Sequence, residues 1–162
     1  MPSRDPLTPM DSPSPMSPMS PMSPMVLVDS SCWIEASRKD GRIEVKAAMK
    51  ALLDEFLALL CGPVELEVLG GARANERKRM QSYFDILPYR TSDHKIWRDA
   101  VQTGWKLRDA GVTAPWNDTI IATIACRYDY RVYSIGKHFS MMAQVLGFSL
   151  YEPGYGGAYN PE

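Results

Sequence analysis

The sequence lacks the features of a disulfide-bonded, zinc-binding or membrane-spanning protein. Its three cysteines, Cys32, Cys61 and Cys126, are odd in number and form no C-x-x-C pair. This argues against a disulfide framework or a zinc site and suits a reducing cytoplasm. We expect all three to be buried as small apolar side chains. No apolar run is long enough to span a membrane, and none resembles the apolar segment of a signal peptide.

The chain also lacks a surplus of either charge. It holds 18 Lys and Arg against 19 Asp and Glu, so nucleic-acid binding would need a local basic patch. The glycine-rich phosphate loops of nucleotide-binding proteins are absent, which leaves nucleotide-cofactor chemistry unsupported. With His94 and His138 as the only histidines and no G-x-S-x-G elbow, a serine-hydrolase triad is not favoured.

Composition divides the chain into a tail, a domain and a second, shorter tail. Residues 1–25 repeat Ser-Pro-Met and hold eight of the 13 prolines and six of the 10 methionines. Such a segment has little to bury, so we expect it to be disordered. Residues 26–152 are long enough for one domain with a sizeable core. We expect "PGYGGAYNPE", residues 153–162, to be a loose C-terminal tail.

Strand and helix patterns alternate along the domain. Strands are expected at 26–28, 57–61, 131–135 and 148–152. Helices are expected from near Trp33, then at 43–54, 63–71, 74–87, 94–110, 117–128 and 139–147, with Asp93 and Asn117 as N-caps and Gly147 as a C-terminal stop. This alternation predicts an α/β fold with three layers and a mainly parallel sheet.

The first strand, Val26–Val28, ends on an aspartate. Short apolar strands of this kind are buried on both faces of a parallel sheet. Asp29 therefore comes at the carboxyl end of a strand, where open α/β sheets place their ligands. A plain alternative is that Asp29 or Ser30 caps the helix that follows.

Two further acids occur in apolar surroundings. Glu67 lies in the short helix after the second strand, and Asp118 opens an apolar helix before the third. Two carboxylates about 4 Å apart repel by roughly 4 kcal/mol at an effective dielectric of 20. A site that gathers several needs protons or a metal, and oxygen ligands select Mg²⁺ or Mn²⁺. Taken singly, Glu67 could be a partly exposed helix residue and Asp118 a cap favoured by the helix dipole.

Four segments in order resemble the PIN-domain nucleases, and within them the VapC-like toxins of type II toxin–antitoxin pairs. They are "VLVDSSCWIE", "VELEVLGGAR", "NDTIIATIA" and "RVYSIGKHF". The resemblance implies a PIN-like three-layer α/β/α domain that hydrolyses RNA with Mg²⁺ or Mn²⁺. It implies Asp29, Glu67 and Asp118 as catalytic residues, with Asp29 and Asp118 holding the metal and Glu67 holding or orienting its water. It also implies a homodimer and a cognate antitoxin that covers the site.

One position departs from the family pattern. The family often has an acid two residues before the His-Phe pair, where this chain has Gly136. Asp129 precedes the third strand and so lies at the opposite sheet edge. Ser134, Lys137 and His138 are nearer, but lysine is no metal ligand, and a histidine here is usually an ordinary helix-start residue. The alternative is therefore a non-catalytic PIN-like binding module that retains antitoxin or RNA contacts.

The densest basic cluster follows Glu67 in the sequence. It comprises Arg73, Arg77, Lys78 and Arg79, and such a run is usually a solvated helix face. Beside a carboxylate site it could instead steer RNA phosphates, and we expect Arg73 to contact RNA. Three tryptophans are assigned to the core or to a partner surface: Trp97, Trp105 and Trp116.

Overall fold

The computed structural model describes residues 23–153 and has the expected α/β fold. Its elements are β1 (Val26–Val28), α1 (Ser30–Ser37), α2 (Ile43–Asp54), β2 (Ala58–Cys61), α3 (Gly62–Gly70), α4 (Arg77–Phe84), β3 (Tyr89–Arg90), α5 (His94–Asp109), α6 (Trp116–Tyr128), β4 (Arg131–Tyr133) and α7 (Lys137–Leu146). The two tails expected at 1–25 and 153–162 lie almost wholly outside the described residues. None of the helices within 23–153 is long and apolar enough to cross a membrane.

The four strands form one sheet in the order β3-β2-β1-β4, and every pairing is parallel. β1 is central, with Leu27 opposite Leu59 of β2 on one side and Val132 of β4 on the other. Because the strands are parallel, their carboxyl ends meet at one edge of the sheet. The residues that follow β1, β2 and β4 therefore come together in space.

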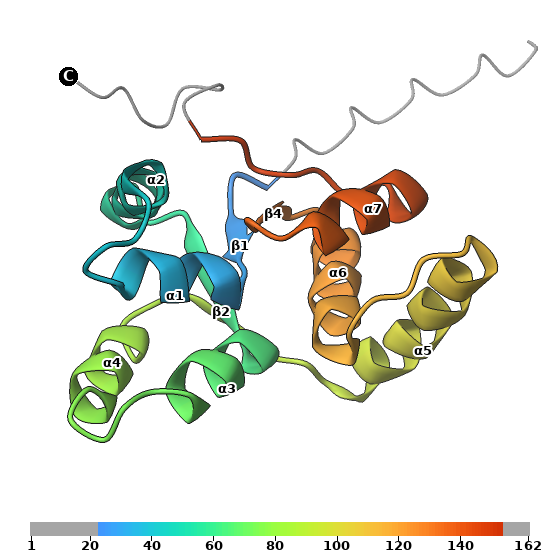
Figure 1. Cartoon of the computed structure of the whole chain (residues 1–162). Coiled ribbons are helices and arrows are strands. Elements are labelled where there is room, and N and C mark those ends of the chain that lie inside the picture. The colour runs from blue at the N-terminus through green and yellow to red at the C-terminus, as the bar shows by residue number, and fades with distance from the viewer. Residues whose placement is uncertain (1–22, 154–162) are drawn as a thin grey trace, which may run out of the picture.

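Helices cover both faces of this sheet (Figure 1). α1, α2 and α4 lie on one side, and α6 and α7 lie on the other, with α5 packed against α6 and α7. α3 follows β2 directly and contacts both α1 and α6. This double covering explains why every residue of β1 and β2 is buried and why both strands are continuously apolar.

Three elements differ from the sequence-based expectation. β3 is an edge strand of two residues after Pro88, too short to leave a periodic pattern. The strand expected at 148–152 is a single bridge between Leu150 and Val132. The helix expected at 74–87 is confined to α4, because residues 74–76 form turns that bring the chain from α3.

Other expectations were wrong about exposure. Cys32 and Cys61 are buried, but Cys126, in the last turn of α6, is exposed. Trp97 and Val101 are about half exposed, so these two residues of α5 lie outside the core. Trp116 is 70% exposed, so of its two expected places, the core or a partner surface, the core is excluded.

Candidate active site

Asp29 stands at the carboxyl end of β1, in the middle of the sheet. Its backbone N–H donates to the carbonyl of Tyr133, so β1 and β4 are joined up to this residue. Its side chain is 6% exposed. Asp29 Oδ2 accepts hydrogen bonds from Ser31 Oγ at 2.6 Å and from Ser134 Oγ at 3.0 Å. This carboxylate is thus held by hydroxyl groups from two separate elements.

The same residue is the N-cap of α1. Its side chain also accepts from the backbone N–H of Ser31 at 3.4 Å. Asp29 can therefore cap α1 and belong to a carboxylate site in the same conformation, so the two expectations for this residue are compatible. A carboxylate at the N-terminus of a helix is further stabilised by the helix dipole.

Glu67 projects from α3 and is anchored at both of its oxygens. Ser30 Oγ donates to Oε2, and Asn117 Nδ2 donates to Oε1 at 2.8 Å. α3 follows β2 without an intervening loop, with Pro63 in its first turn. Glu67 is thereby linked to the residue after Asp29 and to the residue before Asp118.

Asn117 does not cap α6, contrary to the sequence-based expectation. The helix begins one residue earlier, at Trp116, and Pro115 takes the N-cap position without a side-chain cap. The asparagine side chain is therefore free to bind Glu67. Sequence reasoning missed this contact because a polar residue at a helix start is most simply interpreted as a cap.

Asp118 lies in the first turn of α6, and its Oδ2 is 3.2 Å from Nδ1 of His138 at the start of α7. Burial raises the pKa of the Asp118 carboxyl, and the negative charge of Asp29 raises it further. The hydrogen bond from His138 opposes this shift, and Glu67 adds a smaller upward contribution. Asp118 therefore experiences the charges of both other acids.

A buried thiol between the strands responds to the same two charges. Burial raises the pKa of Cys61 to about 12, and Asp29 and Glu67 both add to this shift. The structure thus brings Asp29, Glu67 and Asp118, which we call the acid cluster, to one edge of the sheet. Within residues 23–153, no three or more His, Cys, Asp or Glu side chains form a ready-made group that could hold a metal ion.

Gly136 occupies the position where the family often has an acid. Gly136 is the N-cap of α7 with φ −86°, so its backbone suits any residue. A Cβ at Gly136 would lie 3.5 Å from Ser134 Oγ, an ordinary contact. Ser134 binds Asp29, and His138 binds Asp118. Asp129 is exposed before β4, at the opposite edge of the sheet as expected.

Two hollows lie beside α3 and α4. The first, here called the basic groove, has a volume of about 790 Å³ and is lined by Ile34, Ser37, Arg38, Lys39, Asp40, Glu67, Val68, Gly71, Ala72, Arg73, Glu76, Arg79 and Met80. Glu67 and Arg73 thus border one space. Their side chains form no hydrogen bond or ion pair with each other.

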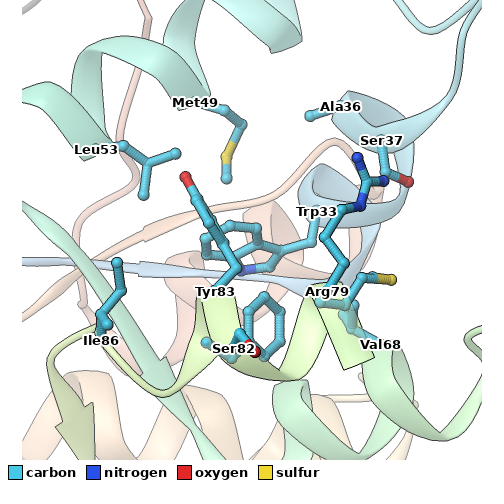
Figure 2. A pocket seen from close by; sticks show the side chains of 12 residues that line it. Trp33, Ala36, Ser37, Met49, Leu53, Val68, Arg79, Ser82, Tyr83 and Ile86 are labelled. Carbon is cyan, nitrogen blue, oxygen red and sulfur yellow. The ribbon is translucent and has the colours of Figure 1, made fainter. Parts of the chain in front are cut away.

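The second hollow, here called the apolar cavity, has a volume of about 520 Å³. Figure 2 shows side chains of α1, α2 and α4 gathered around Trp33 and Tyr83. The Trp33 ring meets Tyr83 edge-on, with centroids 6.4 Å apart. Its buried indole Nε1 has no hydrogen-bond partner among the described residues. Ser37, Val68, Arg79 and Met80 line both hollows, so the two are adjacent.

The chain is similar in sequence to two mycobacterial ribonucleases, although no protein-family model matches it. A VapC ribonuclease of Mycobacterium bovis and ribonuclease VapC11 of Mycobacterium tuberculosis are each 30% identical to it over 124 residues, which cover 74% of this chain and 92% of theirs. The two mycobacterial proteins are similar enough, over enough of their length, to assign a family.

Solved structures agree in fold. FitAcB from Neisseria gonorrhoeae has a TM-score of 0.64 at 15% identity, covering 80% of this chain and 98% of that one. VapBC2 from Rickettsia felis, bound to a DNA fragment from its promoter, has a TM-score of 0.62 at 16% identity, covering 78% of this chain and 97% of that one. The expected three-layer arrangement is confirmed by these likenesses.

Proposed function

This chain belongs to the VapC family of PIN-domain ribonucleases, and from that membership we propose that it is a toxin ribonuclease that hydrolyses RNA phosphodiester bonds with Mg²⁺ or Mn²⁺. The observation that carries the proposal is the acid cluster. Carboxylates from β1, α3 and α6 are gathered at one sheet edge by hydrogen bonds that link their elements.

Asp29 and Asp118 would hold the metal directly, and Glu67 would hold or orient its water. The donor set fits a hard cation because it consists of carboxylate oxygens. Mg²⁺ is commonly bound through one or two carboxylates with waters filling the other positions, so a site with two direct ligands needs no three-residue group. The pKa of Asp118, raised first by burial and then by Asp29, indicates a charge that a cation would relieve.

A metal bound there would activate water and neutralise charge on the phosphate. The remaining tasks fall to side chains. Ser31 and Ser134 fix the orientation of Asp29. Ser30 and Asn117 fix both oxygens of Glu67, and His138 fixes Asp118. Such outer contacts keep ligating carboxylates in place before substrate arrives.

An RNA substrate would meet Arg73 beside Glu67, since both line the basic groove. The side chain of Arg73 makes no hydrogen bond or ion pair within residues 23–153, which leaves it available for a phosphate. Nothing in the acid cluster or the comparisons favours the non-catalytic alternative raised by Gly136. All three acids are present and oriented.

We further propose a cognate antitoxin and a homodimer as partners. The apolar cavity supports a protein partner, because it combines apolar walls with the unpartnered Trp33 Nε1. The exposed side chains of Trp97, Trp105 and Trp116 support a second apolar contact surface, away from the cavity. A second copy of the chain is the occupant that we propose for it.

The direct test is an RNA-cleavage assay on the purified chain with Mn²⁺ and with EDTA. Asp29→Asn should abolish metal-dependent cleavage. The matched control is Asp129→Asn, an exposed aspartate at the opposite sheet edge with φ 56°, a conformation that asparagine tolerates. Cleavage that survives EDTA, or equal losses in both variants, would contradict the proposal.

A further inference from the structure

The basic groove gathers cations from three separate parts of the chain. Arg38 and Lys39 follow α1, Arg73 follows α3, and Arg79 lies within α4. Only Arg38 and Lys39 are neighbours in the sequence, so no single run reveals the whole set. Their convergence is a property of the fold.

Three of these four cationic side chains form no ion pair within the described residues. Arg38 lies 3.6 Å from Glu35, but its own side chain is 63% exposed, so solvent screens this ion pair and it contributes little. Within residues 23–153, the side chains of Lys39, Arg73 and Arg79 make no hydrogen bond or ion pair. Cations held around a hollow without partners are available to an anionic ligand.

The groove is also contiguous with the acid cluster, because Glu67 lines it. Asp40 and Glu76 share its walls, so its net charge is small. Affinity would therefore rest on individual contacts between cations and anions rather than on a broad positive field. A chain of regularly spaced phosphates suits such discrete contacts better than a single small anion does.

We propose that the basic groove holds the single-stranded RNA that flanks the cleaved bond, with Arg38, Lys39 and Arg79 contacting phosphates in addition to Arg73. This inference rests on the proposed ribonuclease function and names where the substrate strand lies. Grooves with dispersed cations track the backbone of single strands. An A-form duplex instead presents a deep, narrow major groove that side chains enter poorly.

Fluorescence anisotropy with a single-stranded RNA of about ten nucleotides tests the proposal, in EDTA so that no cleavage occurs. Arg38→Gln, Lys39→Gln and Arg79→Gln should each weaken binding by roughly three- to tenfold at moderate salt. Each should also reduce the slope of log affinity against log salt by about 0.7, the value for one lost single-strand phosphate contact. The matched controls are Arg98→Gln and Arg108→Gln, exposed cations of α5, which should change affinity less than twofold.

Cleavage kinetics separate this proposal from the ribonuclease function itself. The groove variants should raise KM with little change in kcat, because they remove binding shared by substrate and transition state. If the parent cuts RNA and the groove variants behave like the α5 controls, the groove proposal is wrong and the function stands. If RNA binding depends on the groove but no metal permits cleavage, the proposed function fails. A polyglutamate peptide that binds the same three residues more tightly than RNA would overturn the proposal in favour of an acidic protein partner.

Discussion

Ser134 donates a hydrogen bond to Asp29 across 105 positions of the sequence, at 3.0 Å. This contact joins the residue that follows β1 to the residue that follows β4, and so extends the link between the two strands to the acid cluster. It also places Ser134 where it meets Gly136, whose backbone N–H donates to the same hydroxyl at 3.1 Å. One serine thus connects the first acid with the position where the family often has another.

Gly136→Asp should strengthen metal binding. The backbone at Gly136 accepts a side chain without strain, and a Cβ there faces Ser134. Mn²⁺ affinity, measured by isothermal titration, should rise roughly tenfold as a carboxylate joins the site. A carboxylate at this N-cap of α7 would also add a few tenths of a kcal/mol of stability relative to glycine, so Gly136→Asn is the control that caps without charge. Equal affinities for the parent, Asn and Asp proteins would mean that position 136 does not face the metal.

Asp118→Asn should stabilise the metal-free protein at neutral pH. The pKa of Asp118 is raised in the fold above its usual 3.8 by burial and by Asp29. For such a group, the stabilising contribution is complete below 3.8 and is lost as pH rises through the raised pKa. Thermal melts in EDTA should show a higher melting temperature for Asp118→Asn than for the parent at pH 7, and this difference should disappear below pH 3.8.

The control for Asp118 is Asp109→Asn, an exposed aspartate at the end of α5. Its melting temperature should follow that of the parent at every pH. If Asp118→Asn lowers the neutral-pH melting temperature instead, the contact with His138 outweighs the burial of the charge.

Asn117→Ala should slow cleavage by roughly tenfold, because outer contacts of this kind typically contribute ten- to a hundredfold. The change frees one oxygen of Glu67. RNA affinity in EDTA should be unaffected, which separates positioning from substrate binding. Asn75→Ala, an exposed asparagine before α4, should cleave as the parent does. A melting temperature that falls in step with activity would assign Asn117 a structural role.

Ile86→Glu should weaken antitoxin binding while leaving RNA cleavage intact. Ile86 borders the apolar cavity and is 77% exposed, so the charge is tolerated by the fold but opposes an apolar partner. Co-expression with a candidate antitoxin, followed by co-purification, gives the readout. Ile43→Glu is the matched control, since Ile43 is 81% exposed and does not line the cavity. Equal recovery of the antitoxin with both variants would exclude the apolar cavity as the antitoxin-binding site.

Removal of residues 1–22 should leave the melting temperature and cleavage unchanged. The proposed domain start is close to β1, and the backbone of Pro24 still accepts a hydrogen bond from Arg131 at 2.7 Å. A shorter chain that also lacks Ser23 and Pro24 loses that contact and should melt slightly lower. A large fall in melting temperature on removing residues 1–22 would show that the folded domain begins before residue 23.

The two central strands of the sheet were predictable because each is a continuous run of apolar residues. Val26–Val28 and Ala58–Cys61 are buried at every residue, as their continuous apolar runs predict. The second run could also have been the buried end of the preceding helix, and its flanking Gly62-Pro63 favoured the strand. Tyr89–Arg90 was not predictable, since two residues on a sheet edge need no pattern. The sequence could not decide between core and partner surface for Trp97, because a helix can present apolar residues to a partner as well as to its own core.

The acids could be predicted but their supports could not. Asp29 follows β1, Glu67 lies within α3 and Asp118 lies in the first turn of α6, each inside one of the segments that resemble the family. Ser134 and Asn117 carry no such signal, because serine and asparagine are ordinary residues at strand and helix ends. Their contacts with Asp29 and Glu67 depend on strand register and helix placement, which only the assembled fold specifies.

The pairing of β1 with both β2 and β4 has a consequence for the order of biosynthesis. A ribosome makes Asp29 early, yet its partner Ser134 follows 105 residues later, and His138 follows that. A nascent chain that lacks β4 and α7 therefore contains all three acids but not the contacts that Ser134 makes with Asp29 and His138 makes with Asp118. Long-range parallel pairing forms slowly, so we expect the acid cluster to be completed only after the C-terminal segment of the domain has been synthesised.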